Sequence, residues 1–138
     1  MRKSKNKNKQ ERIEISENAH VDKAISATLK LAETAGFDRT AQSIVATTVS
    51  ELANNILSYA QTGKITIRIL ERKKGKGIEI VAEDNGPGMA DIPAAMRDGF
   101  STSGSLGVGL PGAKRMMDEF EVDSERGVRT RITARKWV

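Results

Sequence analysis

The stretch 64–88, KITIRILERKKGKGIEIVAEDNGPG, decides the fold. Apolar and polar residues alternate over 64–71 and again over 78–83, which is the pattern of half-buried β-strands. Between them, 72–77 (RKKGKG) is charged and contains glycine, as a turn usually does. The stretch therefore predicts a β-hairpin whose second strand ends in a glycine-rich turn at 84–88.

Two helices are predicted before the hairpin. A short alternating strand over 11–16 comes first, and its last residue, Ser16, can cap a helix that ends at Gly36. Thr40 can cap a second helix that runs to about Tyr59. The buried side of the second helix follows helical spacing and consists of Ile44, Val45, Thr48, Val49, Leu52, Ile56 and Leu57.

Shorter elements follow the hairpin. We expect a helix over 91–97, a Ser/Gly loop over 98–106, a third helix that begins between Gly107 and Gly112 and ends near Glu119, and strands over 120–124 and 129–136. Strands are more numerous than a parallel βαβ series would give. We therefore predict an α/β (α+β) two-layer sandwich, in which a mixed, mostly antiparallel sheet has helices on one face.

The net charge of +5 comes from one end of the 138-residue chain. Residues 1–12 hold six Lys and Arg against one Glu, whereas the other 126 residues hold 17 basic and 17 acidic residues. We expect residues 1–11 to form a disordered, basic, solubilising tail, and 12–138 to form one folded domain. Tail contact with nucleic acid is an alternative, but aromatic residues for base stacking make up only 4% of the chain.

The composition also limits the cellular compartment in which the protein is expected and the kinds of site that it can form. The chain has no Cys and one His, which excludes a disulfide framework, a thiolate zinc site and a His-rich metal cluster. No apolar run approaches the roughly 18 residues that span a membrane, and no signal-peptide pattern follows the basic start. We therefore expect a cytoplasmic protein that does not bind membranes.

Glu51 and Asn55 are four residues apart on the second predicted helix, so their side chains share one face. A carboxylate can accept a proton from an attacking hydroxyl group, and an amide oxygen can coordinate Mg²⁺. A solvated polar patch on an amphipathic helix would show the same pair.

Asp84 follows the second strand of the hairpin and begins the DNGPG turn. Its carboxylate can accept a hydrogen bond from an exocyclic amine such as that of adenine, and Gly86 and Gly88 let the backbone approach a ligand closely. An ordinary turn at the end of a strand would have the same sequence.

The loop 104–112, GSLGVGLPG, leads into the third predicted helix. Free backbone N–H groups at a helix start favour a bound phosphate. No strand leads directly into these glycines, which argues against a dinucleotide-binding βαβ unit, and neither a P-loop nor protein-kinase motifs are present. Thr130, near the turn between the last two strands, can place a hydroxyl group beside a base.

Taken together, ExxxN, DxGxG, GxGL and GxxT in this order resemble the Bergerat-type (GHKL) ATP-binding fold of gyrases and histidine kinases. Five segments closely resemble the RsbT-type serine/threonine switch kinases of bacterial stressosomes: 50–53 (SELA), 83–88 (EDNGPG), 98–104 (DGFSTSG), 107–112 (GVGLPG) and 114–120 (KRMMDEF). The resemblance covers about 12–138 and implies that this part is a GHKL-type ATP-binding kinase domain.

The resemblance assigns roles to the motif residues. It implies that Glu51 is the general base, that Asn55 holds the Mg²⁺ that bridges the phosphates of ATP, and that Asp84 binds the adenine amine. It implies an ATP lid over 98–106. The other residues that it places around the nucleotide are Gly86, Gly88, Ser103, Gly104, Gly107, Val108, Gly109, Leu110 and Thr130. Arg129 departs from the pattern, because the last motif usually has a second glycine there.

The resemblance also implies partners. The expected substrate is a serine or threonine of a STAS-domain antagonist protein held with a stressosome scaffold. After phosphorylation, the released kinase binds a downstream regulatory phosphatase or another signalling enzyme. The alternatives are an anti-sigma factor kinase that sequesters a sigma factor and a non-catalytic, ATP-dependent binding adaptor, although the intact Glu51 argues against an adaptor.

Overall fold

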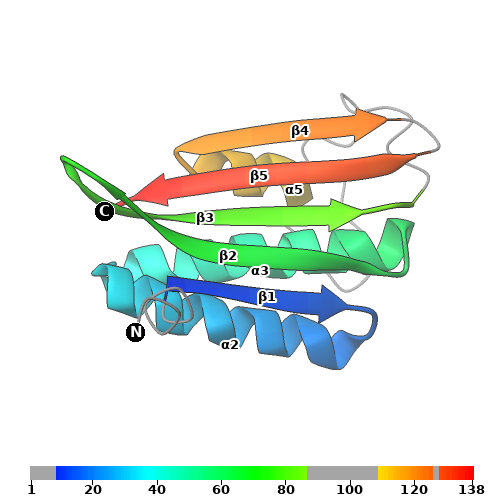
Figure 1. Cartoon of the computed structure of the whole chain (residues 1–138), viewed down its shortest axis with the longest axis horizontal. Helices are drawn as coiled ribbons and strands as arrows, with labels where there is room; N and C mark the ends of the chain where they lie inside the picture. Colours follow the sequence, from blue (N-terminus) through cyan, green and yellow to red (C-terminus); the bar gives the residue numbers. More distant parts are fainter. Residues whose placement is uncertain (1–8, 87–108, 126–127) are drawn as a thin grey trace.

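The computed structural model of the chain describes residues 9–86, 109–125 and 128–138, and this part contains three helices and five strands (Figure 1). In chain order, the elements are β1 (Gln10–Ile15), α2 (Asn18–Ala35), α3 (Arg39–Tyr59), β2 (Gly63–Arg72), β3 (Gly75–Asp84), α5 (Gly109–Met116), β4 (Glu119–Glu125) and β5 (Arg129–Trp137). The helix predicted over 91–97 lies outside the described residues. None of α2, α3 and α5 combines the length and the apolar character that a membrane crossing requires.

The strands form one sheet in the order β1-β2-β3-β5-β4, and each of these four pairings is antiparallel. In Figure 1 the sheet passes in front of α3 and α5, so these helices cover its far face. This arrangement confirms the predicted two-layer sandwich with a mostly antiparallel sheet. The hairpin predicted from 64–83 is the β2–β3 pair, in which Lys64 lies opposite Glu83.

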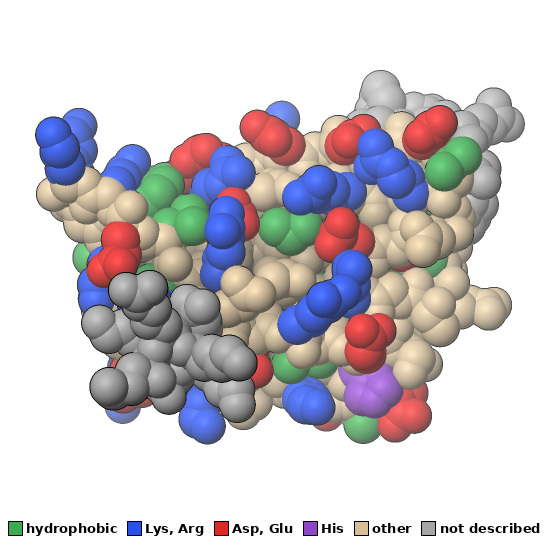
Figure 2. Space-filling view, in the orientation of Figure 1, with side chains coloured by type: hydrophobic (Ala, Val, Ile, Leu, Met, Phe, Trp, Pro, Cys, Tyr) green, Lys and Arg blue, Asp and Glu red, His purple; other side chains and the backbone are tan. Residues whose placement is uncertain are grey.

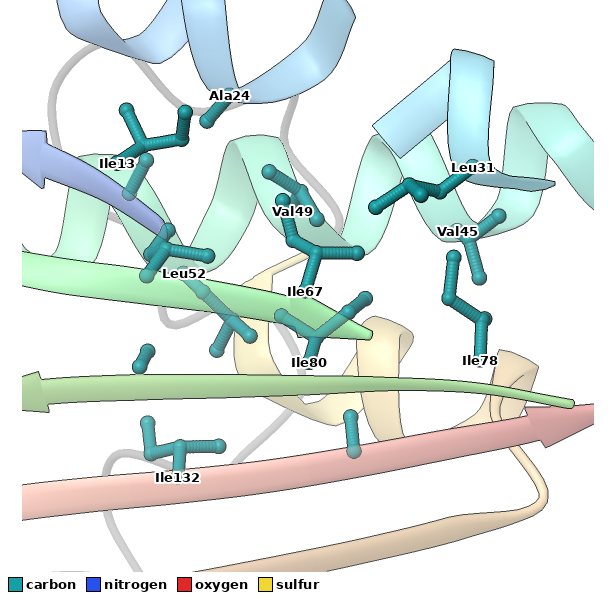
Figure 3. Close-up of a cluster of buried hydrophobic side chains, with 14 of the residues drawn as sticks. Ile13, Ala24, Leu31, Val45, Val49, Leu52, Ile67, Ile78, Ile80 and Ile132 are labelled. Atoms are coloured by element: carbon teal, nitrogen blue, oxygen red, sulfur yellow. The ribbon is translucent and has the colours of Figure 1, made fainter. Parts of the chain in front are cut away.

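The core lies between the helices and the sheet, and Figure 3 shows side chains from both layers pointing toward one another. Alternate residues of the strands, such as Ile67, Ile80 and Ile132, are buried against the helices. The predicted stripe of the second helix is confirmed, since its central residues are buried. Thr48 can belong to this stripe because its hydroxyl group donates to the carbonyl oxygen of Ile44, one turn earlier, at 3.0 Å.

The opposite face of the sheet carries intermingled acidic and basic side chains (Figure 2). Glu79 on β3 is buried there between two arginines. Arg68 Nε donates to one carboxylate oxygen at 2.7 Å and Arg135 Nε donates to the other at 2.8 Å. Burial alone would raise the pKa of Glu79, but the hydrogen bonds from the two guanidinium groups hold that pKa below its usual value.

Both predicted helix caps are wrong. At the start of α3, Asp38 rather than Thr40 is the N-cap, and its carboxylate accepts from the backbone N–H of Ala41 at 2.8 Å. The side chain of Ser16 does not cap α2. Instead, the backbone N–H of Ser16 donates to Nδ1 of His20 at 3.1 Å, and the helix begins two residues after Ser16.

The ends of the chain's elements also differ slightly from the expected limits. β1 begins at Gln10, two residues before the expected start of the folded domain, because Gln10 and Glu11 pair with β2. α5 ends at Met116 rather than near Glu119, since Glu119 already pairs with Arg135 in the sheet.

Candidate nucleotide-binding site

Asp84 and Thr130 lie directly opposite each other on β3 and β5, at the edge of the sheet where β3 ends and β5 begins. The Thr130 hydroxyl group is 3.1 Å from the hydroxyl group of Ser124 on β4. Both Asp84 and Thr130 are buried and belong to the face that the helices cover. The pairing of these strands therefore brings together two of the residues that the sequence singled out 46 positions apart.

The carboxylate of Asp84 is held by the turn that follows it. Its Oδ1 atom accepts a hydrogen bond from the backbone N–H of Gly86 at 3.0 Å. Among the described residues, Gly86 is the one hydrogen-bond donor found for this carboxylate, and it binds Oδ1. Burial raises the pKa of Asp84, and the Gly86 hydrogen bond only partly offsets this effect.

Glu51 and Asn55 occupy the same side of α3, as predicted. Their exposed fractions are only 4% and 6%, so the pair is not the solvated polar patch that the sequence left open as an alternative. Buried polar side chains are uncommon and costly unless they have a partner or a function. The burial of this pair favours a site within the fold over a surface role.

The end of α3 lies against the turn that carries Asp84. Ala60 and Gly86 are so close that a Cβ atom built on Gly86 would lie 2.5 Å from the Cβ atom of Ala60. The N–H of Ala60 donates to the carbonyl oxygen of Ile56 at 2.8 Å, which ties Ala60 to the last turn of the helix. Asn55 is therefore less than two helical turns from the Asp84 turn.

α5 completes the described part of the site. The helix begins at Gly109, and both Gly109 and Leu110 are buried. α5 packs against α3, so its N-terminal end belongs to the same layer as Glu51 and Asn55. An N-terminal end of a helix favours negative charge such as that of a phosphate group.

Arg129 does not enter this site. Residues 129 and 130 are neighbours in β5, so their side chains point to opposite faces of the sheet. Arg129 Nη2 donates to Asp123 Oδ2 at 3.1 Å on the face that lacks helices. The departure from the usual glycine at this position therefore places no side chain on the Thr130 side.

The remaining predicted residues lie outside the described part of the chain. They are Gly88, Ser103, Gly104, Gly107 and Val108, together with the expected lid over 98–106. Their roles remain predictions.

Sequence reasoning missed three residues that shape the site: Ala60, Gly63 and Ser124. Gly63, at the junction of α3 and β2, could have been noticed as a glycine between a helix and a strand. Ala60 and Ser124 carry no such signal, because their importance depends on close approaches to Gly86 and Thr130 across the fold.

A hollow of about 500 Å³ adjoins Asp84 at the same end of the sheet. Its lining includes Arg12, Glu14, Lys64 and Glu83, whose charges are mixed. These four side chains belong to the face without helices, whereas Ala60, which also lines the hollow, follows the last turn of α3, so the hollow opens at the end of the sheet.

Comparisons with known proteins identify the family of the chain. The family model for the histidine kinase-like ATPase domain matches residues 15–136. The chain is 50% identical to the serine/threonine-protein kinase RsbT of Bacillus subtilis over 108 residues, which is 78% of this chain and 81% of that protein. It is 30% identical over 123 residues to an anti-sigma F factor of a Thermoanaerobacter species, covering 85% of this chain and 86% of that factor.

A solved structure shows the same fold at low sequence identity. The SiaB–SiaC complex from Pseudomonas aeruginosa contains a chain that matches with a TM-score of 0.60 and 12% identity, covering 100% of this chain and 96% of that chain. With the family model spanning almost the whole folded part and half of the aligned residues identical to RsbT, the chain belongs to the histidine kinase-like ATPase family and, within it, to the RsbT-type serine/threonine-protein kinases.

Proposed function

We propose that this protein kinase binds Mg²⁺–ATP between α3, the end of β3 and the start of α5, and transfers the γ-phosphoryl group to a serine or threonine of a STAS-domain antagonist protein. The observation that carries the proposal is the meeting of Asp84, Thr130 and the Asn55-bearing end of α3 at one edge of the sheet. The 50% identity to RsbT supports the choice of acceptor.

Adenine recognition falls to Asp84 and Thr130. The Oδ2 atom of Asp84 is a suitable acceptor for the exocyclic amine, while Oδ1 is held by Gly86. The Thr130 hydroxyl group, which is already in contact with Ser124, can bind a water molecule or the purine ring edge. Because Asp84 is buried, this hydrogen bond forms in a medium of low dielectric constant and is strengthened by it.

The described residues fit a magnesium ion that is held mainly by phosphate and water. Asn55 offers one buried amide oxygen, and the described residues contain no group of three or more acidic, His or Cys side chains that could form a metal cage. Mg²⁺ typically keeps several waters and takes few protein ligands when it binds nucleotides. The ion would supply positive charge to the phosphate oxygens.

Phosphoryl transfer needs a positioned hydroxyl group and stabilisation of the charge that develops. The acceptor oxygen bonds to the γ-phosphorus while the bond to the β-phosphate oxygen breaks, and ADP leaves with that electron pair. The proton of the hydroxyl group passes to the Glu51 carboxylate. The backbone N–H groups at the start of α5, near Gly109, stabilise the phosphate charge.

Transfer also changes binding between the two proteins. A phosphoserine or phosphothreonine adds about −1.5 to −2 charges at the interface. Repulsion and the desolvation cost then release the kinase from the antagonist and from its stressosome scaffold. The released kinase can bind a downstream regulatory phosphatase or another signalling enzyme in the cytoplasm.

A second candidate function is capture of a sigma factor by an anti-sigma factor kinase. The similarity to anti-sigma F factors at 30–31% identity favours it over unrelated activities, but that identity is well below the 50% shared with RsbT. Stable co-purification with a sigma factor in the presence of ADP would favour this second function.

The direct test is incubation of the purified chain with labelled ATP, Mg²⁺ and a candidate STAS-domain protein, followed by mass spectrometry. The proposal predicts a phosphate on one serine or threonine of the STAS-domain protein. ATP binding without transfer to any of the candidates, together with an unchanged signalling response of the Glu51→Ala variant, would instead favour the adaptor.

A further inference from the structure

The link between α3 and β2, residues 60–63 (AQTG), touches the turn that carries Asp84 from two sides. Nothing in the sequence motifs draws attention to it. Its second residue, Gln61, has a φ angle of 69°, a left-handed conformation that residues with side chains rarely adopt. Such conformations persist where surrounding contacts force them, so the path of the link is tightly determined.

Gly63 forms the first contact. A Cβ atom at this position would lie 2.5 Å from the backbone oxygen of Glu83, 2.8 Å from Cγ2 of Ile56 and 3.1 Å from Cβ of Asp84. The nearest of these atoms is backbone, so a change of side-chain rotamer cannot relieve the overlap. Any larger residue must shift β2 away from the end of β3 or displace Asp84 itself.

Ala60 forms the second contact. Its Cα and Cβ atoms would lie 2.9 Å and 2.5 Å from a Cβ atom on Gly86. Gly86 in turn donates the hydrogen bond that holds Oδ1 of Asp84. Gly63 therefore lies against the backbone just before Asp84, and Ala60 lies against the backbone just after it.

On its other side, the link meets β1, since Gly63 pairs with Ile15 in the sheet. Ala60, Thr62 and Gly63 all line the hollow of about 500 Å³ that adjoins Asp84. The close approaches to Glu83, Asp84 and Gly86 join the link to the Asp84 turn, so a shift of either one moves the other.

We propose that the link 60–63 determines the base specificity of the site, with Gly63 and Ala60 as positioning residues that aim the Asp84 carboxylate at the exocyclic amine of adenine. The inference rests on the proposed function, since it requires that Asp84 binds the base. Discrimination between a purine with an amine at C6 and one with a carbonyl oxygen there then depends on two features. One is the Asp84 carboxylate, and the other is the packing of Gly63 and Ala60 against the turn that carries it.

The test compares the affinities of Mg²⁺–ADP and Mg²⁺–IDP by calorimetry. IDP carries a carbonyl oxygen where ADP carries the amine, so a correctly aimed carboxylate repels it. Wild type is expected to prefer ADP by about tenfold or more. Gly63→Ala is expected to lose most of this preference, through weaker ADP binding and little change for IDP.

Gly77→Ala is the matched control. A Cβ atom there would overlap the ring of Trp137 at the opposite end of β3, so the variant introduces a comparable clash far from Asp84. This variant should keep the wild-type ratio of ADP affinity to IDP affinity. Ala60→Gly is the second test variant, because it removes atoms and creates no clash, and it should lower the ratio by a smaller factor.

A folded Gly63→Ala variant that retains the wild-type preference overturns the inference. If Gly63→Ala does not fold, Ala60→Gly becomes the deciding variant. An unchanged ratio of ADP affinity to IDP affinity in that variant overturns the inference. If the proposed function itself is wrong, the wild-type protein will bind neither nucleotide or will bind ADP and IDP with equal affinity. This result is distinct from an altered preference in a variant alone.

Discussion

Asp84 and Thr130 face each other across the antiparallel strands β3 and β5, on the face of the sheet that the helices cover. This register places an acceptor carboxylate next to a hydroxyl group that is 3.1 Å from a second hydroxyl group, that of Ser124. The pair defines the base end of the proposed site, and Glu51 and Asn55 define its phosphate end.

Replacing the Asp84 carboxylate should weaken ADP binding. Asp84→Asn keeps the shape of the side chain but removes the negative charge that accepts the amine hydrogen bond, so we expect the dissociation constant for Mg²⁺–ADP to rise about tenfold to a hundredfold. Calorimetry measures the change. Far-UV circular dichroism serves as the folding control, and unaltered ADP affinity in a folded variant would exclude Asp84 from the base site.

ADP binding should also depend on pH through this residue. Burial raises the pKa of Asp84 above its ordinary value of 3.8, so protonation begins at a higher pH than for an exposed aspartate. As pH falls through the raised pKa, the carboxylate loses its charge and ADP affinity decreases. Comparison with Asp84→Asn isolates this contribution, because the variant retains only the pH dependence of the nucleotide itself.

The same shift has the opposite sign for the stability of the unliganded fold. A carboxylate whose folded pKa is raised costs stability when it is ionised in the folded protein. This cost decreases as pH falls below the folded pKa of Asp84 and is absent below the unfolded pKa of about 3.8.

The magnesium dependence of binding should involve Asn55. Asn55→Ala removes the buried amide oxygen that is suited to the ion. We expect ADP affinity measured with Mg²⁺ to approach the affinity measured with EDTA, whereas wild type should show a clear difference. A variant that keeps the full magnesium effect would show that the ion is held without this residue.

Glu79 should stabilise the fold without affecting catalysis, since it lies on the face away from the site. Glu79→Gln removes the charge that Arg68 and Arg135 bind, and we expect a loss of roughly 1–3 kcal/mol in the free energy of unfolding at neutral pH. Because the pKa of Glu79 is lowered, its contribution is present above its unfolded pKa of about 4.5 and is lost as pH falls through the lower folded value. Urea denaturation at pH 7 and at about pH 3 checks both statements, and an equal difference at the two pH values would contradict them.

For the described part of the chain, the sequence predicted the helices and strands and the buried face of each. Alternation over 64–71 and 78–83 identifies the β2–β3 hairpin, and the spacing of Val45, Val49 and Leu52 identifies the buried side of α3. Both signals are local. They specify which way a side chain points, whereas the burial of Glu51 and Asn55 depends on the tertiary packing around α3.

Other features could not be predicted from local sequence, because contacts between distant parts of the chain determine them. Asp38 and Thr40 are both good capping residues, and only the path of the chain after Phe37 selects Asp38. Alternation likewise does not give the neighbour of a strand, so the placement of β5 between β3 and β4 could not be deduced from periodicity. The contact of Gly63 with the end of β3 also depends on which strands are neighbours, so periodicity does not predict it.

Glu51 provides the most direct test of the account. Glu51→Gln should bind Mg²⁺–ADP as wild type does, and its single-turnover transfer of phosphate from ATP to the STAS-domain protein should be slower by about a hundredfold or more, because no carboxylate accepts the proton of the hydroxyl group. Equal transfer rates for Glu51→Gln and wild type, measured at saturating ATP, would contradict the central claim that this buried residue of α3 is the catalytic base.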